Sequence, residues 1–216
     1  MKILLPPSEK KNEPRQKTVL KLNALSFNSD LTATRNAVLK KHKEIDLSYC
    51  DFASNVYEGV LYQALDYTSL SAAAQTRANN SIIIISAAFG AIRLTDVIPY
   101  YKFKIDPSVW KAPLAIALVG LKDELIIDCR SSTYSTVWTP NPLNTVGIRV
   151  FKKVAGQLKV ISHMSKLTRG EVTRYLVSQA KNPRTPQELH KLLSKEFNCR
   201  LSEAEGKKSW FIDVIT

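Results

Sequence analysis

Polar and charged side chains follow apolar, strand-like stretches at three places in this 216-residue chain. The three segments are Leu5–Lys11, Ile127–Tyr134 and Ile161–Gly170. Functional residues of α/β proteins often lie just past the ends of strands, where loops meet over the sheet. The sequence therefore indicates a polar site built from these loops, provided that the three segments meet in space.

The third segment carries basic residues where a helix is predicted to begin. Thr168 and Glu171 have the spacing of a capping box, which places Lys166 and Arg169 beside the helix start, with His163 nearby. Backbone N–H groups at a helix start favour an anion, whereas cations normally avoid that end. The pattern is typical of a phosphate or carboxylate site, or else of a solvated turn with incidental basic residues.

The second segment combines an acid with several donors. Asp128 ends an apolar stretch, and Arg130, Ser131 and Tyr134 follow it. These groups suit an anion clamp or an acid–base site in which Asp128, Tyr134 or Lys166 is catalytic. The alternative is structural: Asp128 pairs with a neighbouring basic group, and the hydroxyls bond to nearby loops.

Further basic residues stand in the first segment and in the middle of the chain. Lys10 and Lys11 follow Pro6-Pro7, and Arg93 precedes Asp96 at a spacing that allows the two to pair. The aromatic and basic residues of Tyr100–Lys104 alternate, which is typical of a base-stacking strip or of a half-buried edge strand.

Common cofactor and metal motifs are missing from the sequence. It contains no GxGxxG, no P-loop, no HExxH and no GxSxG, and its three histidines are far apart. Cys50, Cys129 and Cys199 have no metal-ligand spacing, and scattered thiols suggest a reducing compartment. We predict no cofactor and no metal site.

The net charge is +12, and the basic excess lies toward the two ends of the chain. Such a charge attracts polyanions and raises the rate at which they associate, although a merely soluble cationic surface gives the same count. The apolar run at the N-terminus is too short for a signal peptide, and later runs fall below the ~20 residues of a membrane span. We expect a cytoplasmic protein that binds DNA or another polyanion, or a small anionic ligand, and no membrane.

Hydrophobic patterning predicts a mixed α/β fold. Strands are predicted at 2–5, 81–86, 125–129 and 210–215, with a hairpin of 146–154 and 158–161. Helices are predicted at 32–43, with Arg35 off its apolar side, at 56–65, at 70–78 and at 168–180, and another begins at the Thr185-Pro-Gln-Glu188 box. Because no linker divides residues 1–216, we predict one compact domain with a central mixed sheet, flanking helices and a basic cleft.

Five segments in this order resemble the YaaA family. They are Leu4–Glu9, Val56–Tyr62, Ser86–Tyr100, Asp128–Tyr134 and Ser162–Glu171. The resemblance implies a cytosolic peroxide-stress protein that limits DNA damage by keeping free iron low. It also implies a compact α/β fold with a positively charged cleft, and DNA binding through a helix-hairpin-helix-like element.

The resemblance also implies a set of cleft residues. They are Lys10, Arg93, Asp128, Ser131, Tyr134, Lys166 and Arg169. Related sequences often carry Gly where Lys10 stands, which makes Lys11 an alternative counterpart of the family lysine. The region between Leu31 and Val56 is short for a helix-hairpin-helix and contains no glycine hairpin.

Two functions from different classes remain open on the sequence. The first is a binding protein whose cleft, lined by Lys10 or Lys11, Arg93, Arg130, Lys166 and Arg169, holds nucleic-acid phosphates. The second is an enzyme acting on a small anionic substrate, with Asp128 as acid or base and with Lys166 and Arg169 stabilising negative charge.

Overall fold

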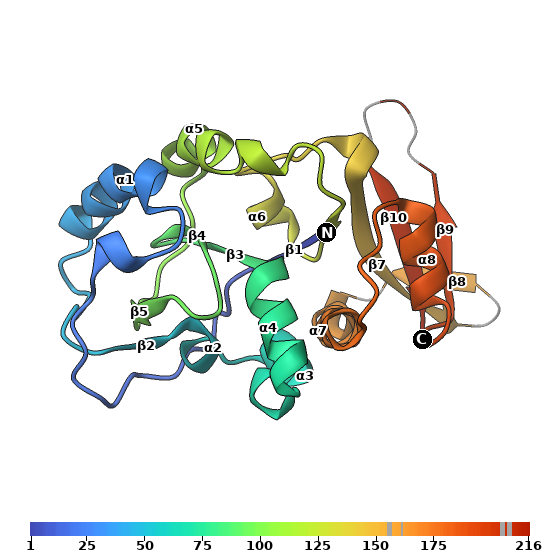
Figure 1. The fold of residues 1–216 in the computed structure, drawn as a ribbon, viewed down its shortest axis with the longest axis horizontal. Coiled ribbons are helices and arrows are strands. Elements are labelled where there is room, and N and C mark those ends of the chain that lie inside the picture. The colour runs from blue at the N-terminus through green and yellow to red at the C-terminus, as the bar shows by residue number, and fades with distance from the viewer. Residues whose placement is uncertain (155–156, 161, 204–205, 207–208) are drawn as a thin grey trace.

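A computed structural model describes residues 1–154, 157–160, 162–203, 206 and 209–216 (Figure 1). The strands are β1 (Lys2–Leu5), β2 (Cys50–Phe52), β3 (Ile82–Ser86), β4 (Gly90–Ile92), β5 (Val97–Pro99), β6 (Ile126–Asp128), β7 (Thr145–Val154), β8 (Gln157–Val160), β9 (Cys199–Ser202) and β10 (Trp210–Ile215). The helices are α1 (Asn28–Lys41), α2 (Ala53–Val56), α3 (Val60–Leu65), α4 (Ala72–Ser81), α5 (Pro107–Ala117), α6 (Ser132–Ser135), α7 (Ser162–Ser178) and α8 (Pro186–Leu193).

The main sheet has eight strands among the described residues, in the order β4-β3-β1-β6-β7-β10-β9, with β8 paired to β7. The strands β3, β1, β6, β7 and β10 are parallel to one another, whereas β4, β8 and β9 are antiparallel to their neighbours. The carboxyl ends of the parallel strands therefore share one edge of the sheet. This arrangement confirms the predicted mixed α/β fold with its central mixed sheet.

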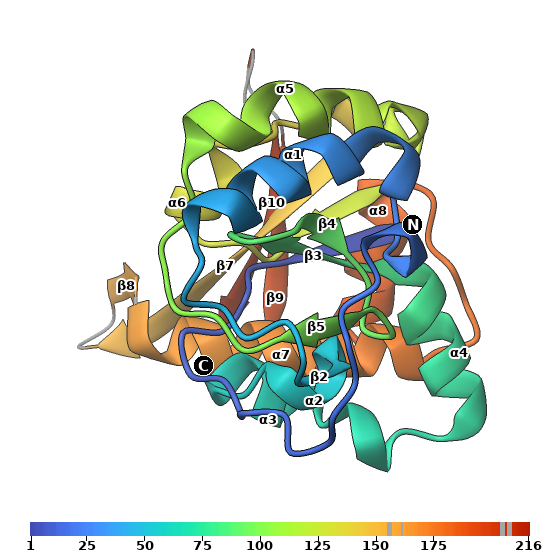
Figure 2. The same cartoon turned by 90° about the vertical axis from the view of Figure 1, so that its left-hand side faces the viewer.

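Helices cover both faces of the N-terminal part of this sheet. In Figure 2, α1 and α5 lie above β3 and β4, and α3, α4 and α7 lie below. The strand β3 is consequently buried along its whole length, as a run of four isoleucines predicts for a central strand. Trp110 of α5 packs against Gly90, whose φ is 68°, and donates its indole N–H to the Ala87 carbonyl at 2.9 Å.

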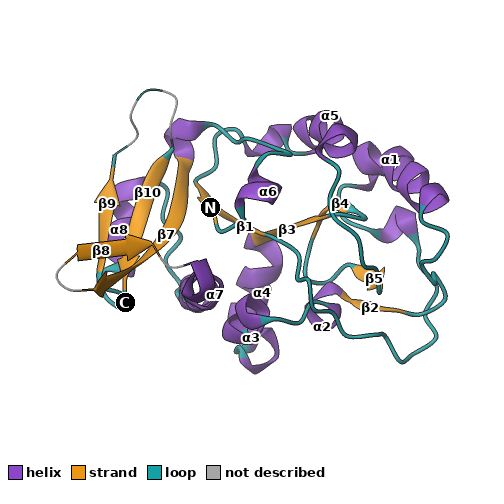
Figure 3. Cartoon of the chain, turned by 180° about the vertical axis from the view of Figure 1, so that it is seen from behind, coloured by secondary structure: helices purple, strands orange, loops and turns teal. Residues whose placement is uncertain are grey.

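The C-terminal part of the sheet has a helix on one face only. Ile148 of β7 and Ile212 of β10 are buried in the same core as Leu189 and Leu193 of α8. Figure 3, viewed from behind, shows the opposite face of β7, β9 and β10 with α8 behind the strands. The alternate residues of these strands therefore separate into a core side and a side that no helix covers in the part of the chain that the structure describes.

Most predicted elements are present with small shifts of their ends. The strand at 2–5, the four-isoleucine strand, the strand near 125–129, the strand at 210–215 and the 146–161 hairpin are confirmed. The hairpin residues Ala155, Gly156 and Ile161 lie outside the described residues. Thr185 accepts a hydrogen bond from the Glu188 amide at 3.2 Å, which confirms the predicted cap of α8.

Several predicted helices differ from the structure. The helix expected at 56–65 is two helices, because Gly59 has a φ of 143° and separates α2 from α3. The helix expected to break at Asn79-Asn80 continues to Ser81. Arg35, expected off the apolar side of its helix, is fully buried and donates to the carbonyls of Phe89, Ser26 and Ala91.

The predicted start of α7 is wrong, and this error changes the interpretation of two candidate site residues. This helix begins at Ser162, six residues before the predicted capping box. Thr168 is buried inside the helix, and its hydroxyl has no hydrogen-bond partner in the described structure. Lys166 and Arg169 therefore lie within the helix and not at its start, so the argument from the helix dipole does not apply to them. No helix in the described part of the chain is long and apolar enough to cross a membrane.

Candidate functional site

The loops that follow β1 and β6 meet at the carboxyl edge of the sheet. Burial raises the pKa of the Tyr134 hydroxyl, and the nearby Glu9 carboxylate raises it further. The helix α7 crosses the same edge, because Arg169 donates from Nε and one terminal nitrogen to the Ile148 carbonyl at 3.2 and 3.1 Å. The structure thus brings together all three segments that the sequence singled out.

Lys11 and a cluster of tyrosines occupy one part of this edge. The Lys11 ammonium donates to the Ser8 carbonyl at 2.6 Å and lies 4.4 Å from the centroid of the Tyr101 ring. Burial lowers the pKa of Lys11 to about 8, while the nearby Glu9 acts in the opposite direction. Tyr57 and Tyr101 share a hydrogen bond of 2.7 Å between their hydroxyls.

The loop that carries Lys11 packs closely against the segment Val56–Tyr62. The Ser8 hydroxyl donates to the Glu58 carbonyl, and a Cβ on Gly59 would lie 2.5 Å from the Ser8 oxygen. A side chain at residue 59 would therefore displace the loop that carries Lys11. This contact gives a physical reason why a glycine stands in the segment Val56–Tyr62.

Asp128 and Arg130 form a tight pair at the end of β6. One Asp128 oxygen accepts from the Arg130 amide at 3.0 Å and from its Nε at 2.9 Å, and the other accepts from a terminal nitrogen at 2.7 Å. Arg130 is buried and also donates to the Tyr134 carbonyl at 3.1 Å. Both carboxylate oxygens are therefore engaged, which agrees with Asp128 being the partner that positions Arg130.

A cavity of about 360 Å³ lies beside this pair and is lined by Arg130, Arg149 and Arg169. Asp128 and Phe211 also line it. Arg149 binds the buried Asp213 at 2.6 Å. In the part of the chain that the structure describes, Arg169 contacts a carbonyl and no carboxylate. We call this cavity the arginine cavity. It contains a guanidinium, that of Arg169, to which a bound anion could supply the missing negative partner.

Two of the predicted residues, Lys10 and Arg93, lie apart from the arginine cavity. Lys10 is exposed and pairs with Glu58 at 2.9 Å. Arg93 donates to the carbonyls of Asn79 and Asn80 at the end of α4, at 2.9 and 3.2 Å. Its side chain does not pair with Asp96, which instead accepts from the Arg93 amide.

The remaining candidates have varied positions. Lys166 is exposed on α7. Ser131 precedes α6, and its side chain makes no capping hydrogen bond there. The side chain of His163 lies outside the described residues. Tyr100–Lys104 is not a strand, and its Tyr101 belongs to the buried tyrosine cluster.

Arg149 is the cavity residue that sequence reasoning missed. It stands in the middle of the predicted hairpin strand 146–154, where the alternation of faces gives no sign of a site. Its place depends on register: β7 pairs Gly147 with Asp128, which brings the next residue on the same face, Arg149, close to the Asp128–Arg130 pair. The strand could be predicted from the sequence, but its pairing with β6 could not.

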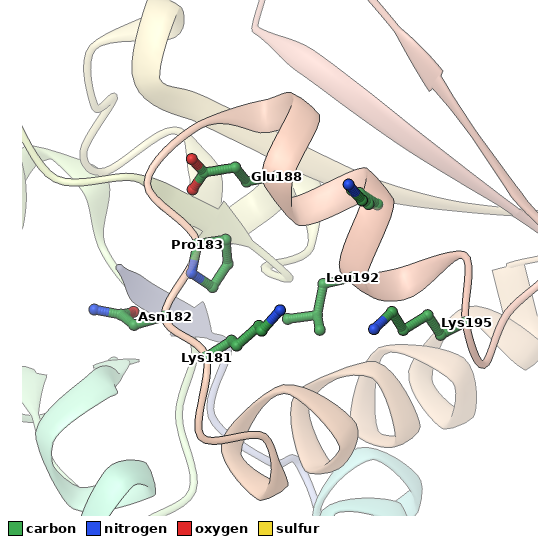
Figure 4. A pocket seen from close by; sticks show the side chains of 7 residues that line it. Lys181, Asn182, Pro183, Glu188, Leu192 and Lys195 are labelled. Atoms are coloured by element: carbon green, nitrogen blue, oxygen red, sulfur yellow. The ribbon is translucent and has the colours of Figure 1, made fainter.

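A second cavity, of about 370 Å³, lies between the end of α7 and α8 and holds none of the predicted residues. Figure 4 shows Lys181 and Lys195 extending toward Leu192 from opposite sides, with Glu188 turned away. Lys191 lies in the last turn of α8, where cations interact favourably with the helix dipole, and Lys195 follows the end of the helix. The dipole is sufficient to account for Lys191.

The three cysteine side chains are buried to different degrees. Cys50 and Cys129 are buried, and Cys199 is partly buried. Burial raises the pKa of Cys50 to about 11 and that of Cys129 to about 12, and it also raises the pKa of Cys199. Among the described residues, no group of three or more histidines, cysteines or acids is placed to hold a metal ion.

Comparison with known proteins places these features in a family. The family model described as peroxide stress protein YaaA matches residues 21–203. The chain is 32% identical to UPF0246 protein SCO2297 of Streptomyces coelicolor, over all of this chain and 98% of that protein. It is 30% identical to UPF0246 protein CE1889 of Corynebacterium efficiens over the full length of both chains, and 29% identical to the uncharacterized protein Cj0984 of Campylobacter jejuni over 79% of this chain and 82% of that one.

Proposed function

Since this chain belongs to the peroxide stress protein YaaA family, we propose that it binds DNA or another polyanion in the arginine cavity. In this proposal the protein acts in the cytoplasm while bound to DNA or another polyanion, and it limits iron-driven oxidative damage to DNA during peroxide stress. The family match supports the link to peroxide stress, and the cavity supports the polyanion.

The observation that carries the proposal is the charge of the arginine cavity. Arg130, Arg149 and Arg169 line it together, and Asp128 is the one carboxylate among its lining residues in the described structure. Asp128 is already held by Arg130, and Arg149 by Asp213, so these arginines are fixed in position before a ligand arrives. A pre-positioned guanidinium loses little conformational freedom when it binds a phosphate.

The rest of the surface favours the same ligand class. At physiological ionic strength the net charge of +12 attracts polyanions and raises their concentration near the protein. Lys166 is exposed on α7, one turn before Arg169, so the helix presents both cations along its length. In this proposal a phosphate chain bound at Arg169 in the cavity continues outward along α7 to Lys166.

We expect a labelled 20-base-pair DNA duplex to bind with an affinity that falls steeply as salt rises, when followed by fluorescence anisotropy. Each phosphate contact contributes about −0.9 to the slope of log K against log [salt]. Arg169→Ala and Lys166→Ala should each weaken binding and reduce this slope by about one contact. Lys111→Ala, on the exposed side of α5, is the matched control and should leave the slope unchanged.

The same variants test protection of DNA. Supercoiled plasmid exposed to ferrous iron and peroxide should be nicked more slowly with the parent protein or Lys111→Ala than with Arg169→Ala. Binding that ignores salt, or equal protection by all variants, would overturn the proposal.

The second candidate is an enzyme acting on a small anionic substrate at the same edge. Its support is the lowered pKa of Lys11 among the tyrosines, since such groups occur at active sites. In this second proposal Asp128 orients Arg130, and Lys11 with the neighbouring Tyr57 and Tyr101 donates and accepts protons during the reaction. Turnover of an anionic metabolite that survives Arg169→Ala but not Lys11→Met would favour it over polyanion binding.

A further inference from the structure

The uncovered face of the C-terminal strands carries arginine and phenylalanine in neighbouring positions. Strand pairing aligns Arg149 of β7 with Asp213 of β10 and Arg200 of β9, so the three lie in one row across the sheet. The adjoining row holds Gly147, Phe211 and Ser202. We call this surface, together with Phe151, the arginine–phenylalanine face.

The row of charged residues is built around a single acid. Asp213 is 0% exposed, yet it accepts hydrogen bonds from Arg149 at 2.6 and 3.0 Å and from Arg200 at 3.0 Å. The two arginine side chains are 40% and 57% exposed. Two cations on one anion leave the face positive. Among the described residues Arg200 donates to Asp213 from its Nε, and its terminal nitrogens contact no described acceptor, so they can donate to a ligand.

The aromatic residues form a layered platform with Arg149. The Phe211 ring lies over Gly147, where a Cβ would come within 2.9 Å of the ring. The Arg149 guanidinium lies 4.2 Å from the centroid of the Phe211 ring and 5.7 Å from that of Phe151. A guanidinium that is held flat by an ion pair and backed by a ring offers a plane on which a nucleobase can stack.

The arrangement selects among nucleic acids. A duplex keeps its bases stacked inside, so it could use only the positive charge of this face. A single strand exposes the flat faces of its bases, which stack on aromatic side chains and arginine planes while basic residues follow the phosphates. The face is also continuous with the arginine cavity, because Arg149, Gly147 and Phe211 line both.

We propose that the arginine–phenylalanine face binds single-stranded nucleic acid. Bases stack on Arg149 and Phe151, and phosphates bind Arg200 and lead toward Arg169 in the cavity. The inference rests on the proposed function for its ligand class and adds the strand form and the surface that recognises it.

The test compares a labelled 20-nucleotide oligothymidine with a duplex of the same length by fluorescence anisotropy at several salt concentrations. The variants are Phe151→Ala and Arg200→Gln, which lie outside the cavity, and Arg169→Ala inside it. Loss of one stacked base or its phosphate contact should weaken single-strand binding on the order of tenfold. Thermal unfolding checks that Phe151→Ala remains folded, and Arg200→Gln leaves Asp213 paired with Arg149.

The outcomes separate the two proposals. The proposal for the face would be supported if Phe151→Ala and Arg200→Gln weaken binding of the single strand and change the affinity for the duplex by no more than about twofold. Single-strand binding unchanged in both would overturn the face, whether or not Arg169→Ala weakens the duplex. Single-strand binding that depends on the face while the duplex ignores Arg169→Ala would support the face and overturn the cavity. A parent protein that binds neither probe at low salt would overturn both proposals.

Discussion

Lys11 is the cation at the carboxyl edge whose surroundings change its chemistry most. Its ammonium has the Ser8 carbonyl and the faces of Tyr101 and Tyr57 as neighbours. These neighbours stabilise a charged amine only in part, because burial removes water from it and lowers its pKa to about 8. Near neutral pH this side chain can therefore serve as a cation or as a free amine.

We predict that Lys11 is acylated with an apparent pKa near 8. At pH 8 about half of such an amine is neutral, against about 0.3% for a lysine at the ordinary value of 10.5. The measurement is the pH dependence of modification by a small acylating reagent at limiting concentration, read by peptide mass spectrometry. Lys10 is the internal comparison, since it is the adjacent residue but is exposed. Identical profiles for the two lysines would contradict the lowered pKa.

The sequence located part of the candidate site at this scale. It singled out Arg130, Tyr134 and the loop that follows β1 as candidates but left open whether they meet; they do, because β1 and β6 are parallel neighbours whose carboxyl ends share an edge. It did not predict Arg149 or the buried Arg35. The first depends on strand register, and the second on three backbone carbonyls that converge only in the folded chain.

At the scale of elements, α7 connects the two parts of the sheet to the site. It packs against α3 and α4 on one side and against β7 on the other. Its contact with α3 is close because residue 170 is glycine: a Cβ there would lie 2.6 Å from the Ala64 side chain and would strike the Leu61 carbonyl. Arg169, the neighbouring residue, is positioned by the same approach.

We predict that Gly170→Ala destabilises the protein by roughly 1–3 kcal/mol, because α7 must move away from α3. Alanine favours an isolated helix by about 1 kcal/mol over glycine, so any destabilisation reports packing rather than propensity. Urea unfolding gives the free energy, and Glu171→Ala, at an exposed position of the same helix, is the control. A Gly170→Ala protein as stable as the parent would show that the helix contact is loose.

The sequence predicted the existence of the elements better than their ends. The isoleucines of β3 and the Thr185 cap of α8 are local signals, and local signals were sufficient there. At Thr168 the same local pattern was misleading. Burial of Thr168 and Gly170 against neighbouring elements extends α7 through the pattern, and tertiary packing of this kind overrides a capping box.

The whole molecule has one sheet with two different environments. The strands β3 and β1 have helices on both faces, whereas in the described structure β7, β10 and β9 have them on one (Figures 2 and 3). The order of strands that creates this division could not be predicted from the sequence, because it follows from long-range pairing. The composition and the alternation of segments were sufficient for the fold class alone.

We predict that amide hydrogen exchange follows this division. Peptides from β1 and β3 should exchange most slowly, because their strands are hydrogen bonded on both sides and their side chains are buried on both faces. Peptides from β8 and β9, at the margin of the one-sided part, should exchange faster by orders of magnitude. Exchange followed by mass spectrometry measures both in one experiment, and equal protection across the sheet would contradict the prediction.

The burial of the thiols has a consequence for a member of a peroxide-stress family. Peroxide reacts with the thiolate, and with a pKa of about 11 only about one Cys50 in ten thousand is ionised at pH 7. Cys129 is ionised still less. Cys50 and Cys129 therefore offer peroxide almost no thiolate at neutral pH, so burial protects these two sulfurs from the first step of thiol oxidation.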